Sequence, residues 1–209
     1  MDEKLNVILA SGSPRRRDLL QEAGVAFTVR TPHAKVDEAL TPDELSQPEE
    51  AAKKLAERKA GAVMQELLAE KPTGMFAVIG ADTMVVKGDA VLGKPRNLDD
   101  AKAMLRYLSG GPHQVITAVS VWLLAAPDVE NVSMGYRTFT DASTVVFRDL
   151  TDDEIAEYLK QGESFDKAGA YAIQGEGRAL VERYEGAYDT IVGLPVERLL
   201  REFPDLKGQ

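Results

Sequence analysis

The sequence lacks cysteine altogether and has only two histidines among its 209 residues. Disulfide bonds, zinc–thiolate sites and iron–sulfur clusters are therefore excluded, and a histidine-rich metal site is disfavoured. No apolar run reaches the roughly 18 residues of a membrane helix, and the stretch MDEKLNVILA is acidic and too short for a signal peptide. We therefore expect a cytoplasmic protein that binds no membrane.

The sequence also has no excess of basic residues. Its formal net charge is −9 and its isoelectric point is about 4.9. Proteins that coat DNA or RNA depend on many lysine and arginine contacts to phosphates, so we expect no nucleic acid polymer as a partner. A small anion needs only a local basic pocket. With 44% hydrophobic and 28% charged residues, the composition is that of a globular protein, and we expect a single domain, residues 1–209.

Basic residues crowd the start of the first predicted helix. The stretch VILASGSPRRRDLL, residues 7–20, is typical of a buried strand followed by a helix whose N-cap is Ser13. Arg15, Arg16 and Arg17 then fall in the first helical turn, where the helix dipole costs about 0.3–1 kcal/mol per cation. A bound polyphosphate would turn this cost into a stabilising interaction. The alternative is that the arginine side chains extend along the surface into water.

The next predicted helix, about residues 49–68, carries a lysine within its apolar stripe. Lys59 lies four residues from both Leu55 and Val63. Such a lysine either extends outward to water or reaches into a polar cleft beside the core. The polar segment 33–50 is predicted to be a long loop, and long loops in compact domains are often functional.

The rest of the chain mixes strands and helices, which indicates an α/β or α+β fold with a mixed sheet. The stretch FAVIGADTMVV is predicted to be a buried strand that is interrupted by a corner at GADT. Asn97 caps one predicted helix, and a capping box of Thr151 and Glu154 begins another. The other predicted elements are a hairpin at 84–95, helices at 98–108 and 152–161, strands at 114–124, 137–147, 179–184 and 188–192, and a final helix after Pro195.

Asp82 is the carboxylate that we expect to carry chemistry, because it follows the apolar run FAVIG at the expected end of a buried strand. Carboxylates also form turns at such corners, so position alone leaves both roles open. Lys94 and Lys167 are further candidates for phosphate contacts. The glycine-rich stretch AGAYAIQGEG is neither a P-loop nor a dinucleotide fingerprint. Its glycines permit either tight turns or a close approach to a flat ligand such as a base.

Five segments, SGSPRR, GADT, GKP, HQV-T and DKAGAYAIQG, resemble in order and spacing the Maf family of nucleoside triphosphate pyrophosphatases. The likeness extends over residues 7–200. It implies an inosine-triphosphatase-like fold, in which helices flank a long, bent mixed sheet and a central cleft separates two lobes. It also implies a homodimeric enzyme that hydrolyses a nucleoside triphosphate to the monophosphate and pyrophosphate with a divalent ion, Mg²⁺ or Mn²⁺.

The resemblance implies roles for residues at matching positions. Asp82 matches the proton acceptor for the attacking water, and Glu38 matches an acidic residue that helps with metal or water, so these two are the expected metal ligands. Arg15, Thr83 and Gln174 match the residues that separate the branch acting on dTTP and UTP from the branch acting on 7-methyl-GTP. The expected substrate-binding residues are Ser11, Ser13, Arg15, Arg16, Lys59, Lys94 and Lys167.

Two other interpretations compete with this hypothesis. A nucleotide-binding regulator of cell division or septum formation would use the same pocket with little or no turnover. The presence of Asp82 beside the basic residues argues against it, because a sensor needs no base to activate water. The other alternative is a globular domain whose arginines serve only as surface residues. No role is predicted for the segment AAPDVENVSMGYRT, residues 125–138.

Overall fold

The computed structural model describes residues 4–208. Their strands form a seven-stranded mixed sheet, which helices cover. Its strands lie in the order β2-β1-β3-β5-β6-β7, and β4 pairs with β3. The pairs of β1 with β2 and with β3 are parallel, whereas the other pairs are antiparallel. The mixed α/β fold class is thus confirmed. The strands are β1 (Leu5–Leu9), β2 (Phe27–Val29), β3 (Gly74–Lys87), β4 (Ala90–Leu92), β5 (Pro112–Ala126), β6 (Ser133–Phe147) and β7 (Val181–Glu185).

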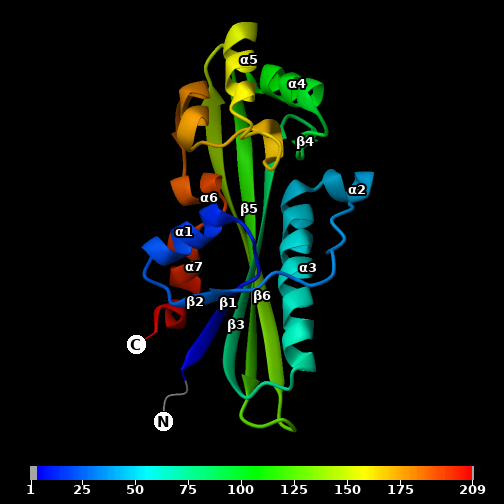
Figure 1. Ribbon diagram of the computed structural model, residues 1–209, viewed down its shortest axis with the longest axis vertical. Coiled ribbons are helices and arrows are strands. Elements are labelled where there is room, and N and C mark those ends of the chain that lie inside the picture. Colours follow the sequence, from blue (N-terminus) through cyan, green and yellow to red (C-terminus); the bar gives the residue numbers. More distant parts are fainter. Residues whose placement is uncertain (1–3, 209) are drawn as a thin grey trace.

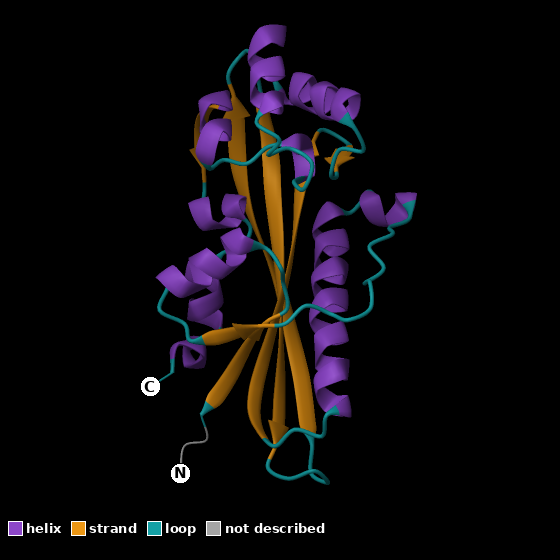
Figure 2. Ribbon diagram, viewed as in Figure 1, coloured by secondary structure: helices purple, strands orange, loops and turns teal. Residues whose placement is uncertain are grey.

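Three long strands, β3, β5 and β6, run through the length of the molecule (Figure 1). β3 and β5 are buried over most of their length, because helices cover the sheet on both sides (Figure 2). β6 is exposed where it begins, at residues 133–137, and is buried at its other end. The segment 125–138, which had no predicted role, forms the turn end of the β5–β6 hairpin. The helices are α1 (Pro14–Glu22), α2 (Pro42–Leu45), α3 (Pro48–Ala69), α4 (Leu98–Leu108), α5 (Asp152–Lys160), α6 (Tyr188–Val192) and α7 (Val196–Glu202), with 3₁₀ turns η1 (Ala168–Ala170), η2 (Gly175–Leu180) and η3 (Pro204–Lys207).

Neighbouring residues of β1 enter cores on opposite faces of the sheet. Leu9 belongs to a cluster with Leu20 of α1 and Leu199 of α7. Ile8 belongs to a second cluster, which contains Val63 of α3. This is the alternation that a strand produces when both of its faces are covered. At the other end of the long strands a separate cluster packs beneath α4 and α5 and includes Val85, Leu105, Phe147 and Ile155.

Local signals predicted most helix bounds correctly. The Asn97 side chain accepts a hydrogen bond from the backbone of Asp100 at the start of α4, and the Thr151–Glu154 capping box is formed at the start of α5. The predicted loop 33–50 contains the short helix α2, which its own capping box of Thr41 and Glu44 begins and which the sequence analysis missed. Among the helices within residues 4–208, none combines the length and the apolar character that a bilayer span requires.

Two predicted features of the sheet are wrong. The strand at FAVIGADTMVV has no corner at GADT, because β3 continues through Asp82 and pairs with β5 from Gly74 to Val86. The segment 188–192 is the helix α6 rather than a strand, although its Thr-Ile-Val run favours β structure. Its residues Thr190, Ile191 and Val192 are all buried, and a helical turn that ends at Gly193 (φ 123°) can bury consecutive residues where an edge strand would expose every second one.

Candidate active site

The candidate site lies where β3 loses its strand partners along one edge. On that edge β1 pairs with β3 as far as Ile79, and β4 begins to pair with it at Val85. Between them, Asp82, Thr83 and Met84 line a cavity of about 970 Å³. Every residue that the sequence analysis assigned to the site lines this cavity: Ser11, Ser13, Arg15, Arg16, Glu38, Lys59, Asp82, Thr83, Lys94, Lys167 and Gln174.

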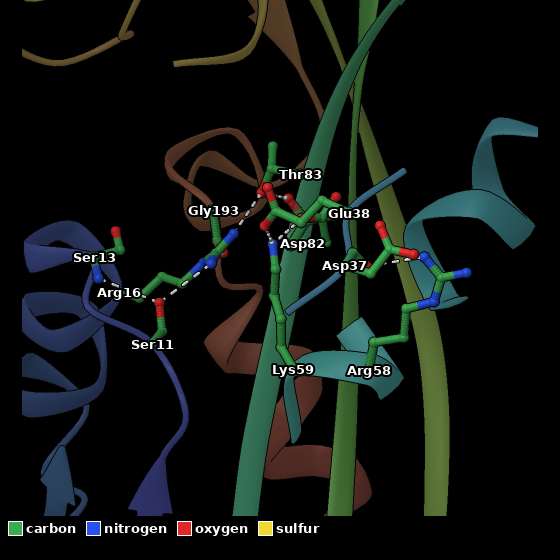
Figure 3. Close-up of polar contacts among 11 residues, drawn as sticks. Ser11, Ser13, Arg16, Asp37, Glu38, Arg58, Lys59, Asp82, Thr83 and Gly193 are labelled. Carbon is green, nitrogen blue, oxygen red and sulfur yellow. Dashed lines mark hydrogen bonds and ion pairs between the residues drawn. The ribbon is translucent and has the colours of Figure 1, made fainter. Parts of the chain in front are cut away.

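At the centre of the site a lysine bridges two carboxylates (Figure 3). The Nζ atom of Lys59 lies 2.5 Å from Oδ1 of Asp82 and 2.7 Å from Oε1 of Glu38. The Lys59 and Asp82 side chains are only 19% and 12% exposed, so this ion pair is largely screened from water. Hydrogen bonding from Lys59 lowers the pKa of Glu38, although partial burial opposes the shift. Lys59 therefore reaches into the polar cleft, and the alternative of an outward-pointing lysine is wrong.

Glu38 lies on the segment before α2, and α3 holds that segment in place. Nη1 of Arg58 donates hydrogen bonds to the backbone carbonyls of Asp37 and Ala39, each at 3.0 Å (Figure 3 shows the contact with Asp37). These carbonyls flank Glu38 on both sides, while Lys59, the next residue of α3, binds the Glu38 side chain itself. One turn of helix thus positions a carboxylate that comes from a loop.

Arg16 turns inward from the first turn of α1, and its guanidinium group is held at three points (Figure 3). Nε donates to the carbonyl of Gly193 at 2.8 Å, Nη1 donates to Oγ of Ser11 at 3.3 Å, and Nη2 donates to Oγ1 of Thr83 at 3.3 Å. Burial lowers the pKa of Arg16, and the charge of nearby Asp82 opposes that shift. A partly buried cation with neutral hydrogen-bond partners is the environment that an anionic ligand would complete.

The three consecutive arginines have different surroundings. Arg15 lines the cavity, and its Nη1 lies 3.8 Å from Oδ2 of Asp166. Arg17 is exposed and pairs only with its neighbour Asp18 within the described residues, so the surface alternative holds for this arginine alone. Ser13 occupies the N-cap as predicted, but within residues 4–208 its side chain makes no capping hydrogen bond. Its backbone N–H instead donates to Oγ of Ser11 at 3.2 Å.

Asp166 is a site residue that the sequence analysis missed. Its carboxylate lies 2.6 Å from Nζ of Lys167 and also faces Arg15. Burial tends to raise the pKa of Asp166, but the hydrogen bond from Lys167 and the two positive charges hold it below its ordinary value. The signal in the sequence is its position beside Lys167 in the segment FDKAGAY.

The glycine-rich segment 167–177 closes one side of the cavity with tight turns. Gly169 has φ 68° and Ala170 has φ 62°, and a Cβ atom at Gly169 would lie 3.1 Å from the Val85 side chain. A turn-forming role is therefore confirmed for Gly169. The turn places Tyr171 against the cavity, where its hydroxyl lies 2.7 Å from Nε2 of His113. Burial lowers the pKa of His113 to about 4, so this ring is neutral near pH 7.

The charges of the site suit a phosphate chain and its counterion. The cavity is lined by six cationic side chains and three anionic ones, within a chain of net charge −9. Within residues 4–208 no group of three or more His, Cys, Asp or Glu side chains could hold a metal ion alone. Asp82 and Glu38 nevertheless converge on one cationic atom. Two carboxylates together with substrate phosphates are a common set of ligands for Mg²⁺, so these residues fit a metal that is shared with the substrate.

Comparison with known proteins matches residues 6–206 to the family model described as Maf-like protein. The chain is 44% identical over 200 residues to the dTTP/UTP pyrophosphatase of Hahella chejuensis, covering 94% of this chain and 92% of that protein. It is 44% identical over 196 residues to the dTTP/UTP pyrophosphatase of a Geobacillus species, covering 94% and 95%, respectively. A dTTP/UTP pyrophosphatase from Vibrio parahaemolyticus is 40% identical over 206 residues, or 97% of this chain and 100% of that protein.

Proposed function

The chain belongs to the Maf family, and from this premise we propose that it hydrolyses dTTP, UTP and modified pyrimidine nucleotides to the monophosphate and pyrophosphate. The observation that carries the proposal is the cavity in which the partly buried cation of Arg16 and the Asp82–Lys59–Glu38 cluster occur together. Phosphoryl transfer depends mainly on positioning and on stabilisation of charge, and this cavity contains the groups for both.

The triphosphate binds along the basic wall of the cavity in this proposal. Its negative charges offset the excess of three positive charges among the lining side chains. We assign the largest contribution to the guanidinium of Arg16, since it is partly buried and a charge-assisted hydrogen bond is stronger away from bulk water. The remaining phosphate contacts are assigned to Ser11, Ser13, Arg15, Lys59, Lys94 and Lys167.

Asp82 is assigned as the base that accepts a proton from the attacking water. Its Oδ1 accepts the hydrogen bond from Lys59, so we assign the proton transfer to Oδ2. Asp82 and Glu38 would hold the Mg²⁺ or Mn²⁺ ion, which when bound neutralises phosphate charge and polarises the scissile phosphorus. The charge that gathers on the departing pyrophosphate is stabilised by Arg15, Arg16 and the lysines of the site.

The preference for pyrimidine nucleotides is assigned to Arg15, Thr83 and Gln174, all of which line the cavity. Residues 1–209 are proposed to act as one domain with two lobes, because β3, β5 and β6 run through both ends of the molecule. A homodimer and a cytoplasmic location stay predictions. Sedimentation equilibrium tests the first, and fractionation of cells tests the second.

Pyrophosphate release from a panel of nucleoside triphosphates, with Mg²⁺ or Mn²⁺ present, tests the proposal directly. We expect turnover of dTTP and UTP, and Asp82→Asn should lower kcat by about 10²–10⁴-fold, the usual contribution of general acid–base catalysis. Nucleotide binding, measured by calorimetry, should remain close to that of the parent. Equal loss of binding and turnover would contradict the role of Asp82. Tight binding with turnover far below about 1 s⁻¹ would instead support a nucleotide-sensing regulator.

A further inference from the structure

We propose that Thr117 is a positioning residue for this reaction, and that it acts on Arg16 through the hydroxyl of Thr83; this inference rests on the proposed function. Thr117 lies on β5 directly opposite Thr83 of β3. It is completely buried and lies outside the cavity lining, whereas Thr83 faces the cavity. A role for Thr117 in catalysis would therefore have to pass through its neighbour.

The directions of the hydrogen bonds follow from the number of protons available. Thr117 Oγ1 lies 2.8 Å from the backbone carbonyl of Thr190, which can only accept, so the single hydroxyl proton of Thr117 is donated there. Thr117 Oγ1 also lies 2.9 Å from Thr83 Oγ1. Because Thr117 has no second proton, Thr83 must donate in this contact.

The consequence for Thr83 is that its oxygen turns lone pairs toward the cavity. Its own proton is directed to Thr117, so it can only accept from the guanidinium of Arg16, whose Nη2 lies 3.3 Å away. The hydroxyl of Thr117 thus makes Thr83 a fixed acceptor for Arg16. Without Thr117, the Thr83 hydroxyl would be free to rotate and to present its proton to the arginine.

The same short helix anchors Arg16 at a second point. Thr190 of α6 supplies the carbonyl that orients Thr117, and Gly193, directly after α6, supplies the carbonyl that accepts from Nε of Arg16 at 2.8 Å. The carbonyl of Gly193 therefore holds the guanidinium directly, and the carbonyl of Thr190 acts on it through Thr117 and Thr83. This leaves further guanidinium N–H groups to be directed at a phosphate chain.

Steady-state kinetics of pyrophosphate release from dTTP and UTP test this inference. Thr117→Val keeps the β-branched shape and removes the hydroxyl, and we expect kcat/KM to fall by about tenfold, less than the about 100-fold cost of removing a transition-state donor itself. Thr117→Ser keeps the hydroxyl and should remain close to the parent. The double variant T83V/T117V should lose no more than T83V alone, because both substitutions break one chain of hydrogen bonds.

Ser120→Ala is the matched control, because Ser120 is a completely buried hydroxyl on the same strand that accepts from Trp122 and Thr138 and lies outside the cavity lining. It should leave kcat/KM unchanged. Thermal unfolding verifies that each variant is folded, and Thr117→Ala replaces Thr117→Val if the latter does not fold.

Three outcomes would overturn the inference: unchanged kinetics of the hydroxyl-free variant, no rescue by Thr117→Ser, or additive losses in the double variant. Absence of turnover in the parent would overturn the proposed function instead, and the affinity for pyrophosphate, measured by calorimetry, would then test Thr117 in the same variants.

Discussion

Replacing Lys59 by methionine is expected to destabilise the protein in a pH-dependent way. The substitution keeps an unbranched side chain, shorter by the terminal atom, but removes the cation that lies 2.5 Å from Asp82 and 2.7 Å from Glu38. Removing one partner of a buried ion pair costs about 3–5 kcal/mol, and we expect about 3 kcal/mol because Glu38 is half-exposed. For a chain of this size each kcal/mol corresponds to about 2–4 °C in Tm, so the expected decrease at pH 7 is about 6–12 °C.

The pH dependence of this decrease identifies its cause. Lys59 lowers the pKa of Glu38 below its ordinary value of 4.5, so the stabilisation is present above that pH and is lost as the pH falls through the lowered value. The difference in Tm between the parent and Lys59→Met should therefore become smaller in strongly acidic buffer. Circular dichroism melts at a series of pH values measure it. Addition of Mn²⁺ should raise the Tm of the variant, since a divalent cation can take the place of the ammonium group.

Lys54→Met is the control, because Lys54 lies on the same helix and pairs with Glu44 at an exposed position. Its Tm should stay close to that of the parent, as exposed ion pairs contribute little. A decrease for Lys59→Met that is equally large at acidic and neutral pH would refute the electrostatic reasoning and indicate lost packing instead. A decrease no larger than that of Lys54→Met would show that the bridge between the carboxylates does not stabilise the fold.

Two further predictions concern the arginine run and the glycine that holds it. Arg17→Gln should leave kcat/KM within about twofold of the parent, whereas Arg16→Gln should lower it by about 100-fold, as for loss of a donor to the transition state; similar kinetics for both variants would contradict the assignment. Gly193→Ala should destabilise the protein by about 1–3 kcal/mol in denaturant titrations, because φ is 123° and the new Cβ would lie 3.3 Å from Thr83 Oγ1. An unchanged midpoint would show that the turn after α6 relaxes without strain.

Local interactions account for most of what could be predicted before the fold was known. The N-cap Asn97 and the Thr151–Glu154 box act within one helical turn, so the helices that they begin appear where the sequence indicates. That the residues assigned to the site line one cavity was also predictable, because the motifs that carry them resemble one family over nearly the whole chain. Asp166 was missed because its contact with Arg15 spans most of the sequence.

Features that depend on distant partners could not be read from local patterns. Asp82 was expected at the end of a strand, but pairing with β5 keeps β3 continuous through it. The segment 188–192 has the composition of a strand, yet packing makes it a helix: the carbonyl of its Thr190 orients Thr117, and the carbonyl of Gly193 directly after it holds Arg16. Neither outcome is encoded within a few neighbouring residues.

The residue types and their order along the chain specify which groups are available: a run of arginines at a helix start, a lysine in an apolar stripe and a carboxylate within a buried strand. The packing of β3, β5, α3 and α6 decides the rest. It determines which arginine turns inward, which carboxylates share the ammonium of Lys59 and where each hydroxyl proton points. The physical reason is that burial and hydrogen-bond direction are properties of the packed molecule, whereas helix capping and side-chain periodicity are properties of a short segment.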